Sequence, residues 1–405
     1  MPTLRVAIAG AGLAGLTLAR RLHHNGVNVR VFERDPDLIA RNPGYRLHIN
    51  STGTTAINDV LDPRTRELFL ATAGIPRQDA LLFDEQLNPG PVRELTASRG
   101  TGNPNADVPE HLVVDRSTLR RILYTGLEGT VRFGARVTGY QSHPDATITV
   151  HLASGRTAEA DVLVGADGIN SAVRAQRLPD HSTVDLEARH IAAKIPLTEE
   201  TKSRIPTQLY SAFTLVNGPH HDIVSFAPLE RSNPRTPLVR ECDPAFRDEV
   251  RRDFAPGIFS AKATRMPDDT QLYTSSPVDL KRYALQRVAS WHPDLITLVR
   301  LWDVDTVQPL TLRSHVPAAP RGPTQVTIVG DAVHAMSPAL GLGANTALRD
   351  AQALWTELVA AASGAKPLLS AIGDYESAMR ACGYDAVRAS AAAGEHLIGH
   401  RSLPA

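Results

Sequence analysis

Residues 4–33 read LRVAIAGAGLAGLTLARRLHHNGVNVRVFE, and this stretch decides the fold. The apolar run at 4–9 is long enough for one buried parallel strand, and the glycines that follow have the spacing G-x-G-x-x-G. Leucines then recur at helical spacing up to Gly26, which is suited to end a helix, and residues 27–32 predict a second strand. The sequence therefore predicts a strand, a glycine loop, a helix and a second strand, as in dinucleotide-binding units.

Each glycine of this loop has its own physical reason. Gly10 allows the tight turn, Gly12 lets the backbone approach a pyrophosphate, and Gly15 lets helix and strand pack closely. The helix start offers free N–H groups and a positive dipole end to phosphates, and Glu33 can accept hydrogen bonds from ribose hydroxyls. The loop by itself leaves FAD and NAD open as the dinucleotide. The candidate binding residues of this unit are Gly10, Gly12, Leu13, Ala14, Gly15, Glu33 and Arg34.

Two later stretches have the same strand–loop–helix pattern with an acid at the end of the strand. Residues 161–174 read DVLVGADGINSAVR, and residues 326–354 read VTIVGDAVHAMSPALGLGANTALRDAQAL. In open α/β sheets, ligands lie beyond the carboxyl ends of the strands. We therefore expect one ligand to be held by three strand ends.

These three motifs together resemble the single-component FAD-dependent monooxygenases related to para-hydroxybenzoate hydroxylase, which include tetracycline and aromatic-polyketide monooxygenases. The resemblance covers the flavin-binding portion of the chain. It implies an α/β fold in which a Rossmann-like FAD-binding domain carries an inserted β-sheet substrate domain and is followed by C-terminal helices. It also implies FAD as the bound cofactor, with NADPH or NADH as a transient co-substrate, and no second G-x-G-x-x-G is visible for the nicotinamide.

The resemblance also assigns residues to the flavin. Asp167 and Gly168 look like the motif that bears on both FAD and NAD(P)H binding, and Asp331 looks like the aspartate that holds the ribityl chain. Arg116 resembles an arginine at a helix start that approaches the flavin. A helix starting near 341–345 would aim its N–H groups and its dipole at the charge of reduced flavin. The later cofactor-binding candidates are Arg46, Arg116, Asp167, Gly168, Gly330, Asp331, Pro338, Gly341, Leu342, Gly343, Ala344 and Asn345.

Smaller candidates have competing structural interpretations. Residues 45–50 (YRLHIN) alternate, so Arg46 and His48 share one face of a strand, and we expect them to be catalytic residues near the flavin or the nicotinamide. A solvated strand face is the alternative for both. His334 is expected to be structural, and Arg174 is expected either to reach a phosphate or to pair with a neighbouring acid. No metal site is expected.

Composition limits the class of protein. The 405 residues carry 43 Lys+Arg and 43 Asp+Glu, and this balance argues against nucleic acid or an anionic membrane as a partner. The two cysteines, Cys242 and Cys382, form no disulfide framework and fit a reducing compartment. No apolar run approaches the length of a membrane span, so we expect a cytoplasmic enzyme. The Arg- and Ala-rich composition is typical of high-GC bacteria, where antibiotic-pathway enzymes are frequent.

The motifs divide the chain. We expect the FAD-binding domain to comprise residues 1–72, 110–182 and 305–362, and the substrate-binding domain to comprise 73–109 and 183–304. A helical segment, 363–405, closes the chain with one or two helices. Within the substrate-binding part, 87–109 predict a hairpin with long loops and 243–301 predict helices broken by prolines. Tyr210, Phe213 and Phe226 are pocket candidates, although core packing is the favoured use of each.

The resemblance implies a reaction. NAD(P)H would reduce FAD, O2 would form a C4a-hydroperoxyflavin, and one oxygen atom would pass to a small aromatic or polycyclic, polyketide-type substrate. Hydroxylation, epoxidation and insertion next to a carbonyl stay open, as does the choice between monomer and homodimer. The alternative is a flavin-dependent oxidase or reductase on the same scaffold, without monooxygenation.

Overall fold

The computed structural model describes residues 4–38, 40, 45–77, 79–91, 93–94 and 111–404. Within these residues, a parallel sheet has the strand order β17-β11-β1-β2-β7. The two strands and the helix predicted for residues 4–33 are confirmed, as β1, β2 and α1. The strands are β1 (Arg5–Ala9), β2 (Asn28–Phe32), β7 (Val131–Arg132), β11 (Val162–Gly165) and β17 (Val326–Ile328).

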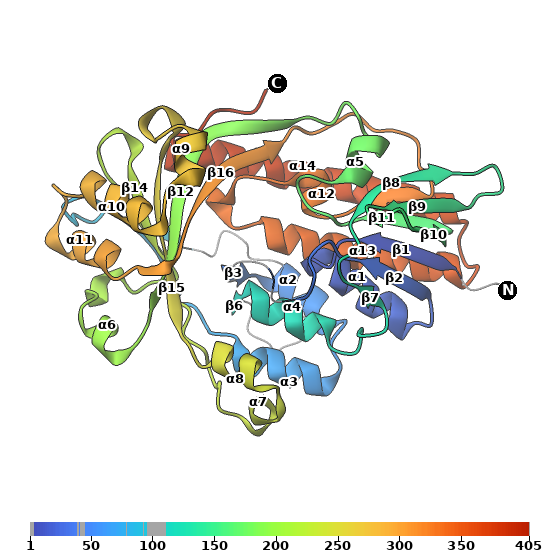
Figure 1. Cartoon of the computed structure of the whole chain (residues 1–405), viewed down its shortest axis with the longest axis horizontal. Helices are drawn as coiled ribbons and strands as arrows, with labels where there is room; N and C mark the ends of the chain where they lie inside the picture. Colours follow the sequence, from blue (N-terminus) through green and yellow to red (C-terminus); the bar gives the residue numbers. More distant parts are fainter. Residues whose placement is uncertain are drawn as a thin grey trace.

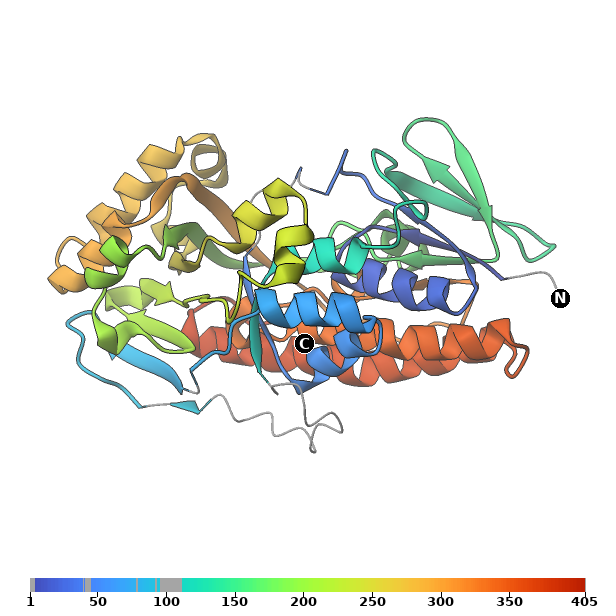
Figure 2. The same ribbon diagram turned by 90° about the horizontal axis from the view of Figure 1, so that it is seen from below.

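Helices and a second small sheet cover this parallel sheet. Helix α1 (Leu13–His24) packs against α4 (Arg116–Tyr124) and α13 (Gly343–Ala362), and α13 packs against α14 (Leu368–Leu397). Figure 2 shows the long orange and red helices along one side of the molecule and a green antiparallel sheet on the opposite side. That sheet consists of β8 (Val137–Ser142), β9 (Ile148–Leu152) and β10 (Thr157–Ala160).

A larger, mostly antiparallel sheet forms the other half of the molecule (Figure 1). One of its faces packs on α10 (Pro277–Arg287) and α11 (Pro293–Arg300) around a separate hydrophobic core. The predicted α/β fold with an inserted β-sheet part is therefore confirmed. In strand order the sheet consists of β16 (Asp303–His315), β12 (Thr183–Pro196), β15 (Phe254–Lys262), β14 (Ile223–Phe226), β13 (Phe213–Asn217), β4 (Asp79–Asp84) and β5 (Arg93–Glu94).

The long strands β12 and β16 connect the two halves. They pair antiparallel from Thr183↔His315 onward, and the backbone N–H of His315 donates to the Ala335 carbonyl at 2.8 Å. The start of this strand pair therefore lies against the flavin-type motif at 326–345, while its other end belongs to the large sheet (Figure 1).

Short elements complete the junction between the halves. Strand β3 pairs antiparallel with β6, with Arg46 opposite Asp115. Their bounds, with those of the remaining short helices and turns, are β3 (Arg46–Ile49), β6 (Leu112–Asp115), α2 (Ser51–Asn58), α3 (Pro63–Thr72), α5 (Ala172–Arg177), α6 (Glu199–Ser203), η2 (Thr207–Leu209), η3 (Pro219–His221), α7 (Pro237–Glu241), α8 (Pro244–Val250), η4 (Ala263–Arg265), α9 (Asp269–Thr274), α12 (Asp331–His334) and the 3-10 turn η5 (Pro338–Leu340).

The prediction of helices throughout 243–301 is wrong for β15. This strand lies between β12 and β14, where Pro256 stands opposite Lys194. Proline lacks a ladder donor and normally argues against a central strand. The next residue, Gly257, is needed for close packing, because a Cβ built there would lie 2.3 Å from Trp302 Nε1. Burial within the large sheet therefore outweighs the local preference of Pro256 and Gly257 against a strand.

The remaining expectations concern the aromatic pocket candidates, the C-terminal segment, the hairpin and a membrane span. Phe226 is buried in the helix-covered core and Tyr210 packs against that core, whereas Phe213 packs in a different cluster. The segment after Pro367 is one helix, α14. Of the segment 87–109, for which a hairpin was predicted, the structure describes the two-residue strand β5, which pairs antiparallel with β4; residues 92 and 95–110 lie outside the described residues, so the hairpin stays a prediction. Among the described helices, none combines the length and the apolar character needed to span a bilayer.

Candidate functional site

The glycine loop after β1 has the geometry that its spacing predicts. Gly10 has φ +103°, a conformation that favours glycine. A Cβ built on Gly15 would lie 2.1 Å from the Gly10 carbonyl oxygen, so the helix and the loop touch there. By contrast, no heavy atom of the described residues lies within 4 Å of a Cβ built on Gly12. The loop thus has an open side at Gly12.

The start of α1 lies at this open side. Its N-cap is Gly12, and in the described structure no side chain caps the first turn. The first N–H groups of a helix need partners outside the helix, and the dipole makes this end positive. The open cradle and the uncapped helix start therefore fit a pyrophosphate of the FAD type.

Glu33 is held at the rim of this cradle. The residue is buried, and its carboxylate accepts the Ala11 N–H at 2.7 Å and the Asp35 N–H at 2.9 Å. The adjacent Arg34 side chain is half exposed and lies 3.7 Å from Asp35. Glu33 therefore lies beside the glycine loop, where a ribose next to the pyrophosphate would meet it.

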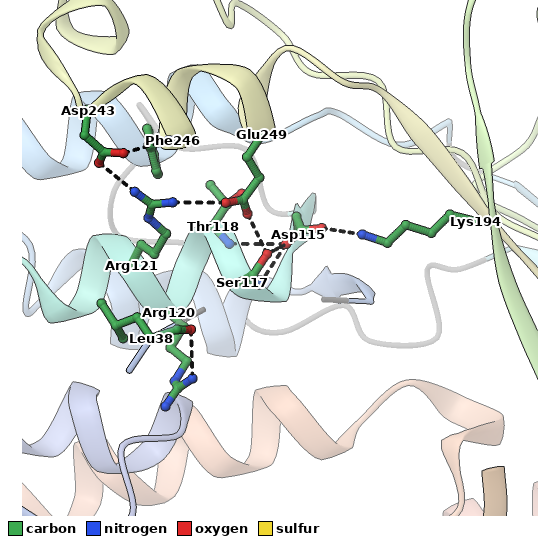
Figure 3. Close-up of polar contacts among 10 residues, drawn as sticks. All are labelled: Leu38, Asp115, Ser117, Thr118, Arg120, Arg121, Lys194, Asp243, Phe246 and Glu249. Atoms are coloured by element: carbon green, nitrogen blue, oxygen red, sulfur yellow. Dashed lines mark hydrogen bonds and ion pairs between the residues drawn. The ribbon is translucent and has the colours of Figure 1, made fainter. Parts of the chain in front are cut away.

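Helix α4 brings two arginines to this region. Arg116 is its first residue, and the N-cap Asp115 accepts the Ser117 and Thr118 N–H groups (Figure 3). Arg120, one turn later, donates through Nε to the Ala11 carbonyl at 2.7 Å. Arg116 was expected from the sequence, whereas Arg120 was not. The four-residue spacing, which puts both on one side of the helix, was the signal that could have found it.

The loop after β11 lies against the glycine loop. A Cβ built on Gly10 would be 2.4 Å from the Ala166 carbonyl oxygen. Asp167 accepts the Ala172 N–H at 2.8 Å, and burial raises the pKa of its carboxyl group. Gly168 has φ +79°. Asp167 and Gly168 therefore stand at the same sheet edge as Gly12.

The described hydrogen bonds of Arg174 are with neither an acid nor a ligand, and the predicted contact with a phosphate stays a prediction. Its Nη1 donates to the Ile169 carbonyl at 2.6 Å and lies 2.6 Å from His315 Nε2. Burial and the nearby Arg174 charge lower the pKa of His315 to about 3. Arg174 thus fixes the 167–169 loop against the end of β16.

The motif after β17 reaches the same edge. Gly330 has φ +64°, and a Cβ there would lie 3.1 Å from Ala347 and 3.4 Å from Ala14. The strand end therefore touches both α13 and α1. Asp331 is exposed, and its Oδ1 lies 3.9 Å from a Cβ built on Gly343. The structure thus brings the aspartate beside the start of α13.

The loop 338–343 lies beside Asp331 and leads into α13. Pro338 opens a 3-10 turn, Gly341 follows with φ +64°, and α13 begins at Gly343 behind the N-cap Leu342, with Ala344 in its first turn. No side chain of the described residues caps this helix start. Its N–H groups and dipole are therefore suited to an anionic ring edge.

Asn345 points inward. Its amide donates to the His48 carbonyl at 2.9 Å and accepts the Asn50 N–H at 2.9 Å. A Cβ on Gly53 would be 2.4 Å from this side chain, so the contact needs glycine there. Asn345 therefore fastens the β3–α2 turn to the start of α13.

Arg46 and His48 lie on β3 at the junction of the two halves. Arg46 donates to the Ala212 carbonyl at 2.7 Å and to the Pro228 carbonyl at 3.2 Å, and burial lowers its pKa to about 10. His48 stacks on His111 with ring centroids 5.0 Å apart, and burial lowers its pKa to about 4. Arg46 thus holds the large sheet to the flavin-type half, and His48 is neutral at pH 7.

A small recess lies beside Arg46 at this junction. Lys194 lies in it, with Nζ 4.0 Å from the Phe254 ring centroid and 3.4 Å from Asp115 Oδ2 (Figure 3). Burial raises the pKa of Tyr45 to about 12. The recess is lined by Tyr45, Ala193, Lys194, Phe254, Pro256, Thr306 and Gln308.

Comparisons with known proteins agree on one type of fold. The sequence profile of the FAD binding domain family matches residues 3–255 and 284–390. A solved structure from Photorhabdus luminescens, assigned as an FAD-containing monooxygenase, is 29% identical with a TM-score of 0.83, covering 98% of this chain and 99% of that chain.

Two curated relatives carry more specific names. A dual O-methyltransferase/FAD-dependent monooxygenase of Cercospora beticola is 30% identical over 419 residues, covering 98% of this chain and 47% of that protein. A 3-amino-4-hydroxybenzoate 2-monooxygenase of Streptomyces cremeus is 32% identical over 178 residues, covering 42% of this chain and 41% of that protein. The chain spans about half the length of the curated relatives that match it first.

Proposed function

The chain belongs to the FAD binding domain family, and from this premise we propose that it is an FAD-dependent monooxygenase that hydroxylates a small aromatic or polyketide-type substrate with NAD(P)H and O2. The observation that carries the proposal is the meeting of three strand ends at one sheet edge. Gly12, Asp167 and Asp331 follow β1, β11 and β17, which are adjacent in the sheet. One extended dinucleotide accounts for all three.

The residues have distinct tasks toward FAD. The cradle at Gly12 and the start of α1 hold the pyrophosphate, Glu33 holds the adenosine ribose, and Asp331 holds the ribityl chain. The start of α13 at Gly343 places N–H groups toward the ring, where they stabilise negative charge. When bound, FAD accepts electrons from NAD(P)H and activates O2 for transfer of one oxygen atom. Arg116 approaches the flavin from α4.

The rest of the molecule positions the substrate and excludes water. We assign residues 1–72, 110–182 and 305–362 to FAD and residues 73–109 and 183–304 to the substrate. Arg46 and His48 lie where the two parts meet, so they shape the site from the flavin side. The substrate class is supported by the names of the relatives, which include a hydroxybenzoate monooxygenase. The nicotinamide binds transiently, because no second glycine motif serves it.

An assay of the purified protein tests this proposal. We expect a yellow protein whose visible flavin bands are bleached by NADPH or NADH without O2. With air present, a panel of phenols, 3-amino-4-hydroxybenzoate and hydroxynaphthalenes should include a compound that accelerates NAD(P)H oxidation. Mass spectrometry after reaction under 18O2 should find one labelled oxygen atom in that product.

Two results would contradict the proposal in different ways. A colourless protein without affinity for added FAD would remove its basis. A yellow protein that neither nicotinamide bleaches, or that releases only hydrogen peroxide with every compound, would favour the alternative of a flavin oxidase or reductase. Release of peroxide without a labelled product would show that the nicotinamide is oxidised without transfer of oxygen to the added compound.

A further inference from the structure

We propose that Arg120 is a positioning residue for the adenosine half of FAD, which it serves by holding Glu33 and the glycine loop in their binding shape. The inference rests on the proposed binding of FAD to this site. Its basis is a set of contacts that one guanidinium group makes to three separate segments of the chain.

The contacts of Arg120 divide among its nitrogens. Nε donates to the Ala11 carbonyl at 2.7 Å, Nη1 donates to the Leu38 carbonyl at 3.2 Å, and Nη2 lies 3.3 Å from Glu33 Oε2. A further carboxylate oxygen, Oδ2 of Asp35, lies 3.7 Å from Nη2. Arg120 therefore ties the middle of the glycine loop, the acid at the end of β2 and the segment after β2 to one point on α4.

The contact with Glu33 is a buried ion pair. The side chains of Arg120 and Glu33 are 5% and 2% exposed. A buried carboxylate beside a pyrophosphate would repel the phosphate charges if it were not balanced. The arginine balances that charge. It also holds Ala11 in place, because it donates to the Ala11 carbonyl while the Ala11 N–H donates to Glu33. Glu33 is thereby held in place beside the loop.

The planar fork of arginine is what makes these contacts simultaneous. The N–H donors of one guanidinium group point in several directions within a plane, whereas a lysine side chain ends in one compact ammonium group. A lysine at position 120 can keep the charge near Glu33 but cannot reach Ala11 and Leu38 in the same way. Charge and geometry can therefore be separated by substitution.

The adjacent arginine supplies a matched control. Arg121 projects to the other side of α4, where it lies 2.6 Å from Asp243 and 3.3 Å from Glu249 of α8 (Figure 3). Its guanidinium also lies 4.9 Å from the Phe246 ring centroid. Arg121 is also an arginine of α4 and also has two acidic partners among the described contacts, but none of these contacts is with the glycine loop.

The experiment measures affinity for FAD and for FMN on the apo-protein. FMN keeps the isoalloxazine ring, the ribityl chain and one phosphate, but lacks the adenosine that Glu33 would hold. Flavin fluorescence quenching gives both dissociation constants for the wild type and for Arg120→Met, Arg120→Lys and Arg121→Met. ADP, which competes through the adenosine half alone, is titrated against bound FAD as a third probe.

We expect Arg120→Met to weaken FAD and ADP binding by about ten- to a hundredfold, the effect of losing hydrogen bonds that involve charged groups. FMN binding should fall by a clearly smaller factor, because FMN keeps one phosphate at the glycine loop but lacks the adenosine that Glu33 would hold. Arg120→Lys should fall between wild type and Arg120→Met for FAD. Arg121→Met should leave all three dissociation constants unchanged, although its unfolding temperature falls.

Equal losses of FAD and FMN affinity in Arg120→Met would overturn the inference, since they would mean general damage to the fold. Unchanged FAD affinity would overturn it as well. If Arg120→Met does not fold, the same comparison on Arg120→Lys decides the matter, with a selective loss of FAD and ADP supporting the inference. A wild type that binds no FAD would instead refute the proposed function.

Discussion

Asp350 lies directly behind the Gly330–Asp331 turn, and its Oδ2 is shared by the His334 imidazole and the Gly330 N–H, the latter at 3.4 Å. The His334 and Asp350 side chains are 0% and 1% exposed. Burial lowers the pKa of His334, but the Asp350 carboxylate outweighs this and raises it. The pair therefore supports Gly330 in its positive-φ conformation at the carboxyl end of β17, next to Asp331. His334 contributes to this support through Asp350.

Breaking this pair should be costly. Asp350→Asn leaves a buried imidazole without its counter-charge, and such changes cost about 3–5 kcal/mol. Urea unfolding followed by circular dichroism measures the loss. The control is Glu376→Gln, in which a buried carboxylate that accepts from Thr327 is neutralised away from the turn. A loss below about 1 kcal/mol for Asp350→Asn would contradict a charged pair.

Stability should fall as the pH drops below about 6.5. Burial lowers the pKa of His48, His181 and His190 to about 4 and that of His315 to about 3. These groups are neutral in the folded state and take up protons on unfolding, so their stabilisation is present above about 6.5 and is lost toward pH 4. Each contributes a slope of up to about 1.4 kcal/mol per pH unit. The contribution of His334 to stability has the opposite pH dependence, because it is lost as the pH rises through the raised pKa of this residue.

Urea titrations at several pH values measure this slope. His315→Gln removes one of the four groups and should flatten the acid side by about one group's contribution. A stability that stays constant between pH 6.5 and pH 4.5 would contradict the neutral, buried state of these imidazoles.

Two glycines of the first loop should separate folding from binding. Gly12→Ala adds a methyl group where no described atom lies within 4 Å, at φ −77°, so its stability should change by less than about 1 kcal/mol. FAD affinity should fall at least about tenfold, because the methyl group occupies the pyrophosphate's space. Gly15→Ala instead places a methyl group 2.1 Å from the Gly10 carbonyl oxygen and should lower stability by about 1–3 kcal/mol. Normal FAD binding by Gly12→Ala would show that the cradle is misplaced.

Asp331→Ala should weaken FAD binding without unfolding the protein. The side chain is exposed, so its removal leaves the core intact. Loss of hydrogen bonds between a carboxylate and ribityl hydroxyls corresponds to about ten- to a hundredfold in affinity. Asp385→Ala, on the exposed face of α14, is the matched control and should bind FAD as the wild type does. Full retention of FAD by Asp331→Ala would mean that the ribityl chain lies elsewhere.

Local sequence patterns predicted the helices and strands correctly where the backbone conformation depends on residues close by in the chain. The strand at Arg5–Ala9, the helix at Leu13–His24 and the strand at Asn28–Phe32 follow from apolar spacing and glycine positions alone. The strand at Phe254–Lys262 did not follow, because its proline and glycine are compensated only by Trp302 and the neighbouring strands.

Side-chain direction was beyond the sequence at several site positions. The described hydrogen bonds of the Asn345 and Arg174 side chains fasten the β3–α2 turn and the 167–169 loop, and no local pattern indicated these contacts. Arg120 carried no motif of its own, and its contacts with Ala11 and Leu38 join segments 82 to 109 positions apart in the chain.

The sequence by itself determined that this chain builds a dinucleotide-binding unit, because the conformation of Gly10, the close contact at Gly15 and the acid after the second strand depend on short-range geometry. Only the tertiary structure decided which charged groups meet there. Arg120 reaches Glu33 because α4 packs against α1, and Asp350 reaches His334 because α13 packs against α12. Burial then makes each meeting obligatory, since an ionised group removed from water needs a partner.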